Sequence, residues 1–366
     1  MDGRALRASR ERRGVGVYLE QLLRELARLH PEDEYRVLVP GVPRDGTLPE
    51  NVELIEVGRA GRALHGAAAL AGRPRLDRLL DGPELVWAPA PAPLAVSPGT
   101  PFVLTVHDLS FVHRPRDYGR YERLWHRVAR PRRLARRAQR VLTDSDTVRA
   151  ELLDEWQLPP ERVRTVRPGP GRRAPAAAAR AGAAAAGAAP AGAGGGRPAH
   201  VLAVGGLEPR KQPALLVEAH RLARERGLRA GLVFVGDGPL RGELEDAGAT
   251  VLGRVGEREL DSAYADALCL ACVSREEGFG FTPVEAISAG VPAVVSDLPV
   301  FRESLGDAAL AVAPGDAEAL ATALLRLERE PELRERLVAA GSERVRLLSW
   351  ERAARETHAV FEEAVR

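Results

Sequence analysis

Short apolar runs alternate with longer helical patterns along nearly the whole chain of 366 residues. The runs lie at 35–39, 52–57, 85–88, 102–106, 140–143 and 163–166, and then at 200–204, 231–235, 250–252, 269–273 and 293–296. The helical patterns lie at 15–29, 121–138, 212–225, 283–289, 317–329 and 331–347, with a final amphipathic helix at 350–366. This alternation is typical of βαβ units. The sequence therefore predicts an α/β fold with two doubly wound parallel sheets that bind ligands at the carboxyl ends of their strands.

The stretch 174–198 separates the two series of strands. It consists almost entirely of alanine and glycine, with three prolines and no hydrophobic period, so it cannot bury a core. An alanine-rich helix is the alternative, but Gly182, Gly187 and Pro190 argue against it. The sequence therefore predicts a linker at 174–198 between domains at 1–173 and 199–350.

Charge and cysteine content exclude several classes of protein. The chain has 53 Lys+Arg against 51 Asp+Glu, a net charge of +2. Residues 1–173 carry 31 basic and 23 acidic side chains, which leaves 22 basic and 28 acidic side chains for the rest of the chain. Two cysteines cannot form a disulfide framework, and no stretch approaches ~18 consecutive apolar residues, which excludes a secreted scaffold and a spanning protein. No secretory signal pattern opens the sequence, so we expect a cytoplasmic protein.

Lys211 is the only lysine in a chain that otherwise uses arginine. It ends the run 201–211, in which a strand leads into a glycine turn and then to Arg210 and Lys211 at an expected helix start. Amide groups, the helix dipole and two cations are what a diphosphate requires. The alternative is a surface lysine left by chance. The run 233–239 is a second glycine-rich strand exit, but it lacks the full Gly-x-Gly-x-x-Gly pattern, which disfavours a nicotinamide enzyme.

Two glutamates, Glu277 and Glu285, flank a Gly-Phe-Gly turn. Thr282 and Glu285 have the spacing of a capping box with Pro283 as the first helical residue, so Glu285 has a plausible structural role. Glu277 has no such role. It precedes a glycine-lined loop, where a carboxylate and exposed amides can bind sugar hydroxyls or a charged leaving group.

These motifs resemble the donor half of the retaining glycosyltransferases of family 4, which have the GT-B fold. The resemblance rests on the Glu277-x7-Glu285 segment and on three further motifs of the second half, at 205–211, 236–239 and 252–255. It extends to Thr105-Val-His-Asp108, Gly14-Val-Gly16 and the Ser-Trp-Glu351 entry to the last helix, and so covers essentially the whole chain. It implies two Rossmann-like domains facing across a cleft, with helix 351–366 crossing back to complete the N-terminal domain.

The resemblance also implies roles for the matching residues. Arg210 and Lys211 would hold the donor diphosphate, Glu285 would bind the nucleotide ribose, and Glu277 would hold the donor sugar. His107 would face that sugar from the other domain. The remaining implied donor-binding residues are Gly14 and Gly16 of the loop over the phosphates, then Gly205, Gly236, Gly238, Val255, Gly278, Phe279 and Gly280.

The resemblance implies retaining, metal-independent transfer of a hexosyl residue from a nucleotide-diphosphate sugar, as co-substrate and with no cofactor, to a glycan or lipid-linked acceptor. Gly206 and the Thr282-Pro283 pair depart from the commoner pattern and look like mannosyl- or rhamnosyl-type enzymes, which favours GDP-mannose. A catalytically inactive sugar-nucleotide-binding subunit is the alternative. The presence of both His107 and Glu277 argues against it.

Two further pairs of residues imitate metal sites. Asp144 and Asp146 have Asp-x-Asp spacing, but the cations already placed for the diphosphate make a metal redundant, so capping or turn roles are favoured. Cys269 and Cys272 lie inside an expected strand with no second pair, which favours buried small hydrophobes. We therefore expect no metal.

Eleven arginines fall between Arg114 and Arg140. Several recur at helical spacing opposite Leu124, Val128 and Leu134, which is consistent with a solvated helix face. The alternative is a surface for anionic lipid headgroups or a lipid diphosphate, which would place the protein peripherally at the inner face of the membrane. Nucleic acid is not expected as a partner.

The first parallel strand of the family has no counterpart upstream of Asp2, because only Met1 precedes that residue. This strand is central in a sheet of order 3-2-1-4-5-6, and its loss would leave neighbouring backbone groups unpaired. We therefore expect an upstream start that adds a short apolar strand.

Overall fold

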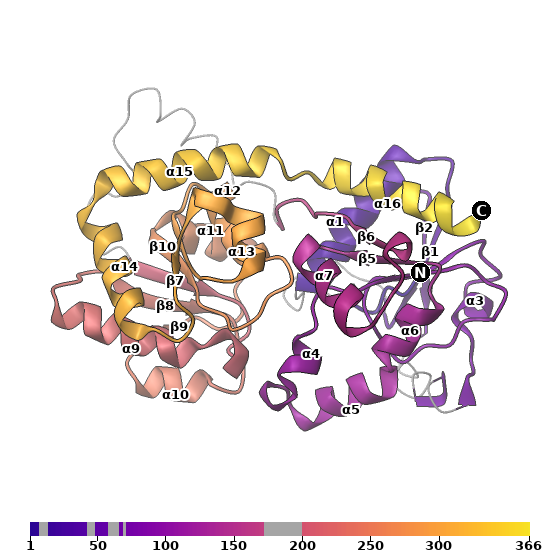
Figure 1. Ribbon diagram of the computed structural model, residues 1–366, viewed down its shortest axis with the longest axis horizontal. Helices are drawn as coiled ribbons and strands as arrows, with labels where there is room; N and C mark the ends of the chain where they lie inside the picture. Colours follow the sequence, from indigo (N-terminus) through magenta and orange to yellow (C-terminus); the bar gives the residue numbers. More distant parts are fainter. Residues whose placement is uncertain (7–13, 42–47, 58–65, 69–70, 172–199) are drawn as a thin grey trace. The chain divides into compact units, whose positions relative to one another are not determined.

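The computed structural model describes residues 1–6, 14–41, 48–57, 66–68, 71–171 and 200–366 (Figure 1). The predicted linker at 174–198 lies outside the described residues. The chain divides into two compact units. One comprises Met1–Gly169 together with Ser349–Arg366, so it includes the final helix, and the other comprises Pro170–Leu348.

The first unit contains two parallel sheets. One pairs β1 (Tyr35–Val39) with β2 (Val52–Glu56), and the other has the order β3-β4-β5-β6, formed by β3 (Val86–Ala88), β4 (Phe102–Thr105), β5 (Arg140–Thr143) and β6 (Val163–Thr165). β4 is buried along its whole length, as expected for a central strand between two helical layers.

Residues Met1–Gly3 connect these two sheets. Asp2 donates its N–H to the carbonyl of Trp87 in β3 (3.0 Å), and Gly3 donates to the carbonyl of Leu38 in β1 (2.9 Å). Asp2 and Leu38 form an isolated parallel bridge. A Cβ on Gly3 would overlap the side chain of Val37, so only glycine fits this close approach. Residues Met1–Gly3 thus lie between β1 and β3, at the position expected for the central strand.

Seven α-helices whose bounds are fully described belong to the first unit. They are α1 (Gly14–Leu29), α3 (Leu76–Leu79), α4 (Ser110–His113), α5 (Arg120–Ala129), α6 (Pro131–Arg137), α7 (Asp146–Glu155) and α16 (Trp350–Val365). The prediction of one helix at 121–138 is wrong. Arg130 adopts a left-handed conformation (φ 50°) and Pro131 has no N–H to donate, so the helix ends and a second one begins.

Helix α16 packs against α1 (Figure 1). Its N-cap is Ser349, whose hydroxyl accepts a hydrogen bond from the N–H of Arg352 (3.3 Å). The rings of Trp350 and Tyr18 lie edge to face with centroids 5.9 Å apart, and Ala354 is fully buried. The last helix is therefore part of the core of the first unit.

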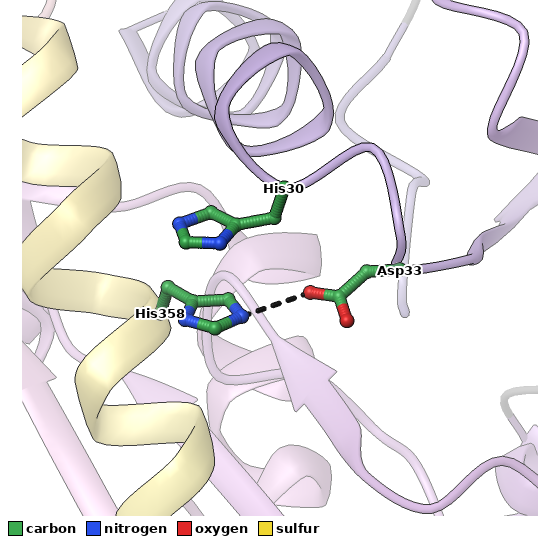
Figure 2. Close-up of side chains that lie close together, drawn as sticks. All are labelled: His30, Asp33 and His358. Atoms are coloured by element: carbon green, nitrogen blue, oxygen red, sulfur yellow. Dashed lines mark hydrogen bonds and ion pairs between the residues drawn. The ribbon is translucent and has the colours of Figure 1, made fainter.

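A second contact joins the two helices near the end of α1 (Figure 2). Nε2 of His358 lies 2.9 Å from a carboxylate oxygen of Asp33, which also accepts a hydrogen bond from Tyr35 (3.1 Å). The rings of His30 and His358 are stacked, with centroids 3.4 Å apart and planes within 4°. A metal ion bound by a histidine nitrogen lies in the plane of that imidazole ring. Because these two rings are stacked in parallel planes, one ion cannot be bound by both, and we assign this cluster to packing.

The second unit contains one parallel sheet of order β12-β11-β10-β7-β8-β9. Its strands are β7 (His200–Val204), β8 (Gly231–Val235), β9 (Thr250–Val251), β10 (Ala267–Cys272), β11 (Ala293–Ser296) and β12 (Ala309–Val312). Its α-helices are α9 (Pro213–Glu225), α10 (Arg241–Asp246), α11 (Glu257–Ala265), α12 (Phe281–Ser288), α13 (Pro299–Leu305), α14 (Ala317–Arg329) and α15 (Pro331–Arg346). Val201 and Leu202, adjacent in β7, belong to different core clusters because alternate side chains enter opposite faces of the sheet.

Each predicted strand is confirmed, with ends that differ by at most two residues, whereas β12 was missed. Among the described residues no helix combines the length and the apolar character that a bilayer span requires.

We predict that Ala354→Asp destabilises the first unit by at least about 3 kcal/mol, because it buries a carboxylate without a partner between α16 and the rest of the core. Arg352→Asp is the matched control, since the Arg352 side chain is 44% exposed. Thermal unfolding of both variants checks the expectation. Equal melting temperatures would show that α16 is not part of the core.

Candidate functional site

Three loops of the second unit are joined by backbone hydrogen bonds at the carboxyl edge of its sheet. Gly205, which follows β7, donates its N–H to Val235 at the end of β8 (2.9 Å). Gly236 donates to Gly253, which follows β9 (2.8 Å), and Leu207 donates to Asp237 (3.2 Å). The loops that the sequence analysis assigned to the donor therefore form one continuous backbone surface.

Glycine is required at these contacts. Gly205 and Gly236 have φ angles of 135° and 143°, which disfavour any side chain. A Cβ on Gly236 would overlap the carbonyl oxygen of Gly205, and a Cβ on Gly238 would lie 2.5 Å from that of Leu207. Gly236 and Gly238 thus have a backbone-packing role, whereas Gly205 is required for its backbone conformation.

Arg210 and Lys211 lie in the 3-10 turn Pro209–Lys211 that follows β7. The predicted helix at 212–225 is confirmed except for its first residue, and the two cations precede it in this separate turn. Gln212 is left-handed (φ 50°), and α9 starts only at Pro213. The two cations are therefore held one turn before the helix, on the loop beside β10.

The ammonium of Lys211 donates a hydrogen bond to Oε1 of Glu277, which belongs to the loop after β10. The same carboxylate oxygen accepts a hydrogen bond from Ser274 (2.7 Å), and the Glu277 side chain is only 13% exposed. Nε of Arg210 lies 3.0 Å from Glu208. Because β7 and β10 are neighbours in the sheet, this ion pair joins two adjacent strand ends.

Glu277 is held in its charged form. Burial raises the pKa of Glu277, but the charges of Lys211 and Arg210, with hydrogen bonds from Lys211 and Ser274, lower it below its usual range. A lowered pKa in the folded state stabilises the fold above the pKa of the unfolded chain, and this contribution is lost as the pH falls through the folded value. Glu277 therefore cannot supply a proton near neutral pH.

The loop after Glu277 differs from the sequence expectation. The Phe279 side chain is 3% exposed and packs in the core against Phe281, so this side chain is not open to a ligand. Gly280 is left-handed (φ 91°) and is the N-cap of α12, which begins at Phe281. The predicted capping box of Thr282 and Glu285 is wrong, because no side chain caps this helix.

Glu285 has other neighbours instead. Its Oε2 accepts a hydrogen bond from the buried Tyr264 of α11 (3.3 Å). A Cβ on Gly171 would overlap Oε1 of Glu285, so the backbone at Gly171 passes directly over this carboxylate. Val255 packs against the same cluster as Tyr264. Tyr264 could not be predicted from the sequence, because no motif marks it.

The first unit holds the remaining candidates. Gly14 is the first residue of α1 and is exposed, whereas Gly16, two residues further along, is buried. His107 follows β4, and its Nδ1 lies 2.6 Å from a carboxylate oxygen of Asp144, which follows β5. No motif in the sequence marks Asp144 as the partner of His107.

The residues of the two suspected metal patterns have other partners. Ser145 caps α7 by accepting a hydrogen bond from Val148 (3.2 Å), and Asp146 pairs with Arg167 (2.5 Å). Cys269 and Cys272 are free thiols, and burial raises their pKa values to about 12 and about 11. The thiols stay protonated near neutral pH, which agrees with their expected role as small hydrophobes.

Comparison with known proteins identifies the family. Residues 194–344 match the family model of the glycosyl transferases group 1, and residues 12–169 match that of Glycosyltransferase Family 4. The chain belongs to glycosyltransferase family 4. It is an enzyme of the transferase class with the GT-B fold of two Rossmann-like domains.

Several relatives of this glycosyltransferase are mannosyltransferases. The O-antigen chain mannosyltransferase B of Escherichia coli is 28% identical over 374 aligned positions, which cover 94% of each chain. The phosphatidyl-myo-inositol mannosyltransferase of Mycobacterium leprae is 38% identical over 164 positions, 42% of this chain and 44% of the relative. The solved sucrose-phosphate synthase from Thermosynechococcus elongatus superposes with a TM-score of 0.70 at 18% identity, covering 98% of this chain and 94% of the other; it supports the fold alone.

We predict that Gly236→Ala destabilises the second unit by more than about 3 kcal/mol, because the added methyl group meets the Gly205 carbonyl. Gly242→Ala is the matched control. It lies in α10, no described atom lies within 4 Å of its Cβ, and alanine favours the helix. Urea unfolding should separate the two variants. Equal stability would contradict the direct contact between the two loops.

Proposed function

We propose that this glycosyltransferase moves a hexosyl residue of the mannosyl or rhamnosyl type from a nucleotide-diphosphate sugar to an acceptor hydroxyl, with retention of anomeric configuration and without a metal. The observation that carries the proposal is the pairing of Lys211 with Glu277 between the loops after β7 and β10. GDP-mannose is the favoured donor, since both relatives described above are named mannosyltransferases. A glycan or a lipid-linked sugar is the proposed acceptor.

The ion pair is compatible with diphosphate binding. An ammonium has three N–H donors, and Glu277 accepts one of them, which leaves two for phosphate oxygens. The carboxylate thus orients Lys211 and leaves two of its N–H donors available. Lysine presents a compact charge that approaches phosphate more closely than the broad guanidinium group of arginine.

The reaction proceeds by cleavage of the bond between the anomeric carbon and the diphosphate oxygen, which keeps the electron pair. Arg210 and Lys211 stabilise the developing negative charge without a metal. The acceptor oxygen bonds the anomeric carbon on the face that the diphosphate leaves, and its proton passes to a phosphate oxygen. Glu277 is ionised and ion-paired, so it positions the sugar, while Glu285, fixed by Tyr264, binds the ribose.

Transfer from GDP-mannose to a panel of mannosides and lipid-linked sugars, with and without EDTA, tests the proposal. We expect an α-linked product from the α-linked donor, read from the one-bond carbon–proton coupling, and unchanged rates in EDTA. A β-linked product would contradict retention. Loss of activity in EDTA, restored by Mg²⁺ or Mn²⁺, would contradict metal independence, and binding without transfer would favour the inactive subunit.

Lys211→Ala should lower kcat/KM by roughly 30- to 1,000-fold, which corresponds to the ~2 to 4 kcal/mol lost with one preorganised electrostatic group. Lys211→Arg keeps the charge beside Glu277 and should still be impaired, which separates catalysis from stability. The control is Arg221→Ala, because Arg221 is an exposed cation of α9. Turnover of Lys211→Ala within threefold of the native enzyme would refute the diphosphate assignment.

We also propose a cytoplasmic location with peripheral contact between the Arg114–Arg140 segment and an anionic membrane. Eight of its arginines are exposed: Arg116, Arg120, Arg123, Arg127, Arg130, Arg132, Arg133 and Arg136. Leu124, which the sequence analysis placed on a face opposite the arginines, is itself 58% exposed, and Tyr121 is 62% exposed. Cations beside exposed apolar and aromatic side chains suit a bilayer interface.

Binding to anionic vesicles should therefore exceed binding to neutral vesicles and should weaken at high salt, because each cation contributes ~1 kcal/mol that is screened within a Debye length. The variant Arg120→Gln/Arg123→Gln/Arg127→Gln should reduce sedimentation with anionic vesicles. The control Arg221→Gln/Arg226→Gln removes exposed charges from α9 and its C-cap in the other unit. Equal partitioning of the native protein into both kinds of vesicle would favour the solvated face.

A further inference from the structure

Asp144 is a buried carboxylate whose position the transfer reaction described above does not explain. It follows β5, is 2% exposed, and places Oδ2 2.6 Å from Nδ1 of His107. Its other oxygen is also buried and has no hydrogen-bond partner among the described residues. A buried carboxylate with one strong partner stays charged only if that partner is a cation.

The second nitrogen of the His107 ring points to the same conclusion. Nε2 lies 2.8 Å from the carbonyl oxygen of Pro89. A carboxylate and a carbonyl only accept hydrogen bonds, so each ring nitrogen must carry a proton for both contacts to be satisfied. Only the imidazolium form of histidine has two N–H groups. The geometry around His107 therefore selects the cation.

The groups that face His107 from neighbouring elements favour the same state. They are Asp144 after β5, Asp108 beside it in the chain, and Tyr18 of α1, whose ring meets the imidazole edge to face with centroids 4.8 Å apart. Burial lowers the pKa of His107, but Asp144, Asp108 and the hydrogen bonds raise it above its usual value. Burial and then Asp144 raise the pKa of Tyr18, so that phenol stays neutral.

We propose that Asp144 is a positioning residue that holds His107 as a fixed imidazolium, so that His107 carries a positive charge and has no proton-accepting nitrogen. This inference rests on the proposed function and on the role in sugar transfer that the family resemblance implies for His107. It deepens that function in one respect. An imidazolium has no lone pair, so the acceptor proton cannot pass to His107.

Histidine ¹⁵N spectra of the full-length chain between pH 5.5 and 9 test the charge state. We expect both His107 nitrogens to be protonated and to show no titration from pH 6 to 8, with the signals assigned by their loss in His107→Gln. In Asp144→Asn the same signals should titrate at lower pH. Asp146→Asn is the matched control, because that carboxylate of the same tripeptide is exposed and pairs with Arg167. A neutral His107 at pH 7.5 in the native chain overturns the proposal, even if Asp144→Asn does not fold.

The pH profile of kcat/KM is a second measurement. A purely structural role of Asp144 would not change the shape of this profile. Asp144→Asn lowers the His107 pKa, so its activity should fall roughly tenfold per pH unit above that value and recover toward the native rate below pH 6. Asp146→Asn should follow the native profile. An Asp144→Asn profile parallel to the native one overturns the proposal. If the spectra are as expected but no sugar nucleotide supports transfer, the proposed function fails and the charge assignment stands.

Discussion

The ion pair between Lys211 and Glu277 is the interaction on which the donor side of the account depends. It joins the ends of two adjacent central strands, and it keeps a nearly buried carboxylate ionised next to the chain's only lysine. A buried charge is tolerated when it is paired and hydrogen-bonded, and Ser274 completes that requirement. The pair therefore positions a cation at a strand end, where open α/β sheets bind their ligands.

The first unit uses the same arrangement with different residues. His107 follows β4 and Asp144 follows β5, and these two strands are neighbours in their sheet. In each unit a cation at one strand end is held by a carboxylate from the next. The two sites differ in exposure of the carboxylate, since Asp144 is almost fully buried and Glu277 is partly open. We infer that charge fixed before the substrate arrives is the common principle of both candidate sites.

The strands could be predicted from the sequence because a short run of apolar residues indicates a buried strand. Lys211 could be singled out because it is the only lysine in the sequence. The errors arose where backbone conformation decides the outcome. Left-handed Arg130 and Gln212 end or delay helices that the periodic pattern allows, and left-handed Gly280 caps α12 before Thr282 can. The partnership of His107 with Asp144 could not be predicted, because it depends on the register of β4 and β5 and the residues are 37 positions apart.

The most direct test of the central claim compares the binding of GDP and GMP by calorimetry. If Lys211, held by Glu277, reads the diphosphate, the native chain should bind GDP more tightly than GMP, and Lys211→Ala should lose that preference while its affinity for GMP stays the same. The expected difference is roughly 1.5 to 3 kcal/mol, the range for hydrogen bonds to charged groups. Equal affinities for GDP and GMP in the native chain, or a preference that Lys211→Ala leaves unchanged, would contradict the account.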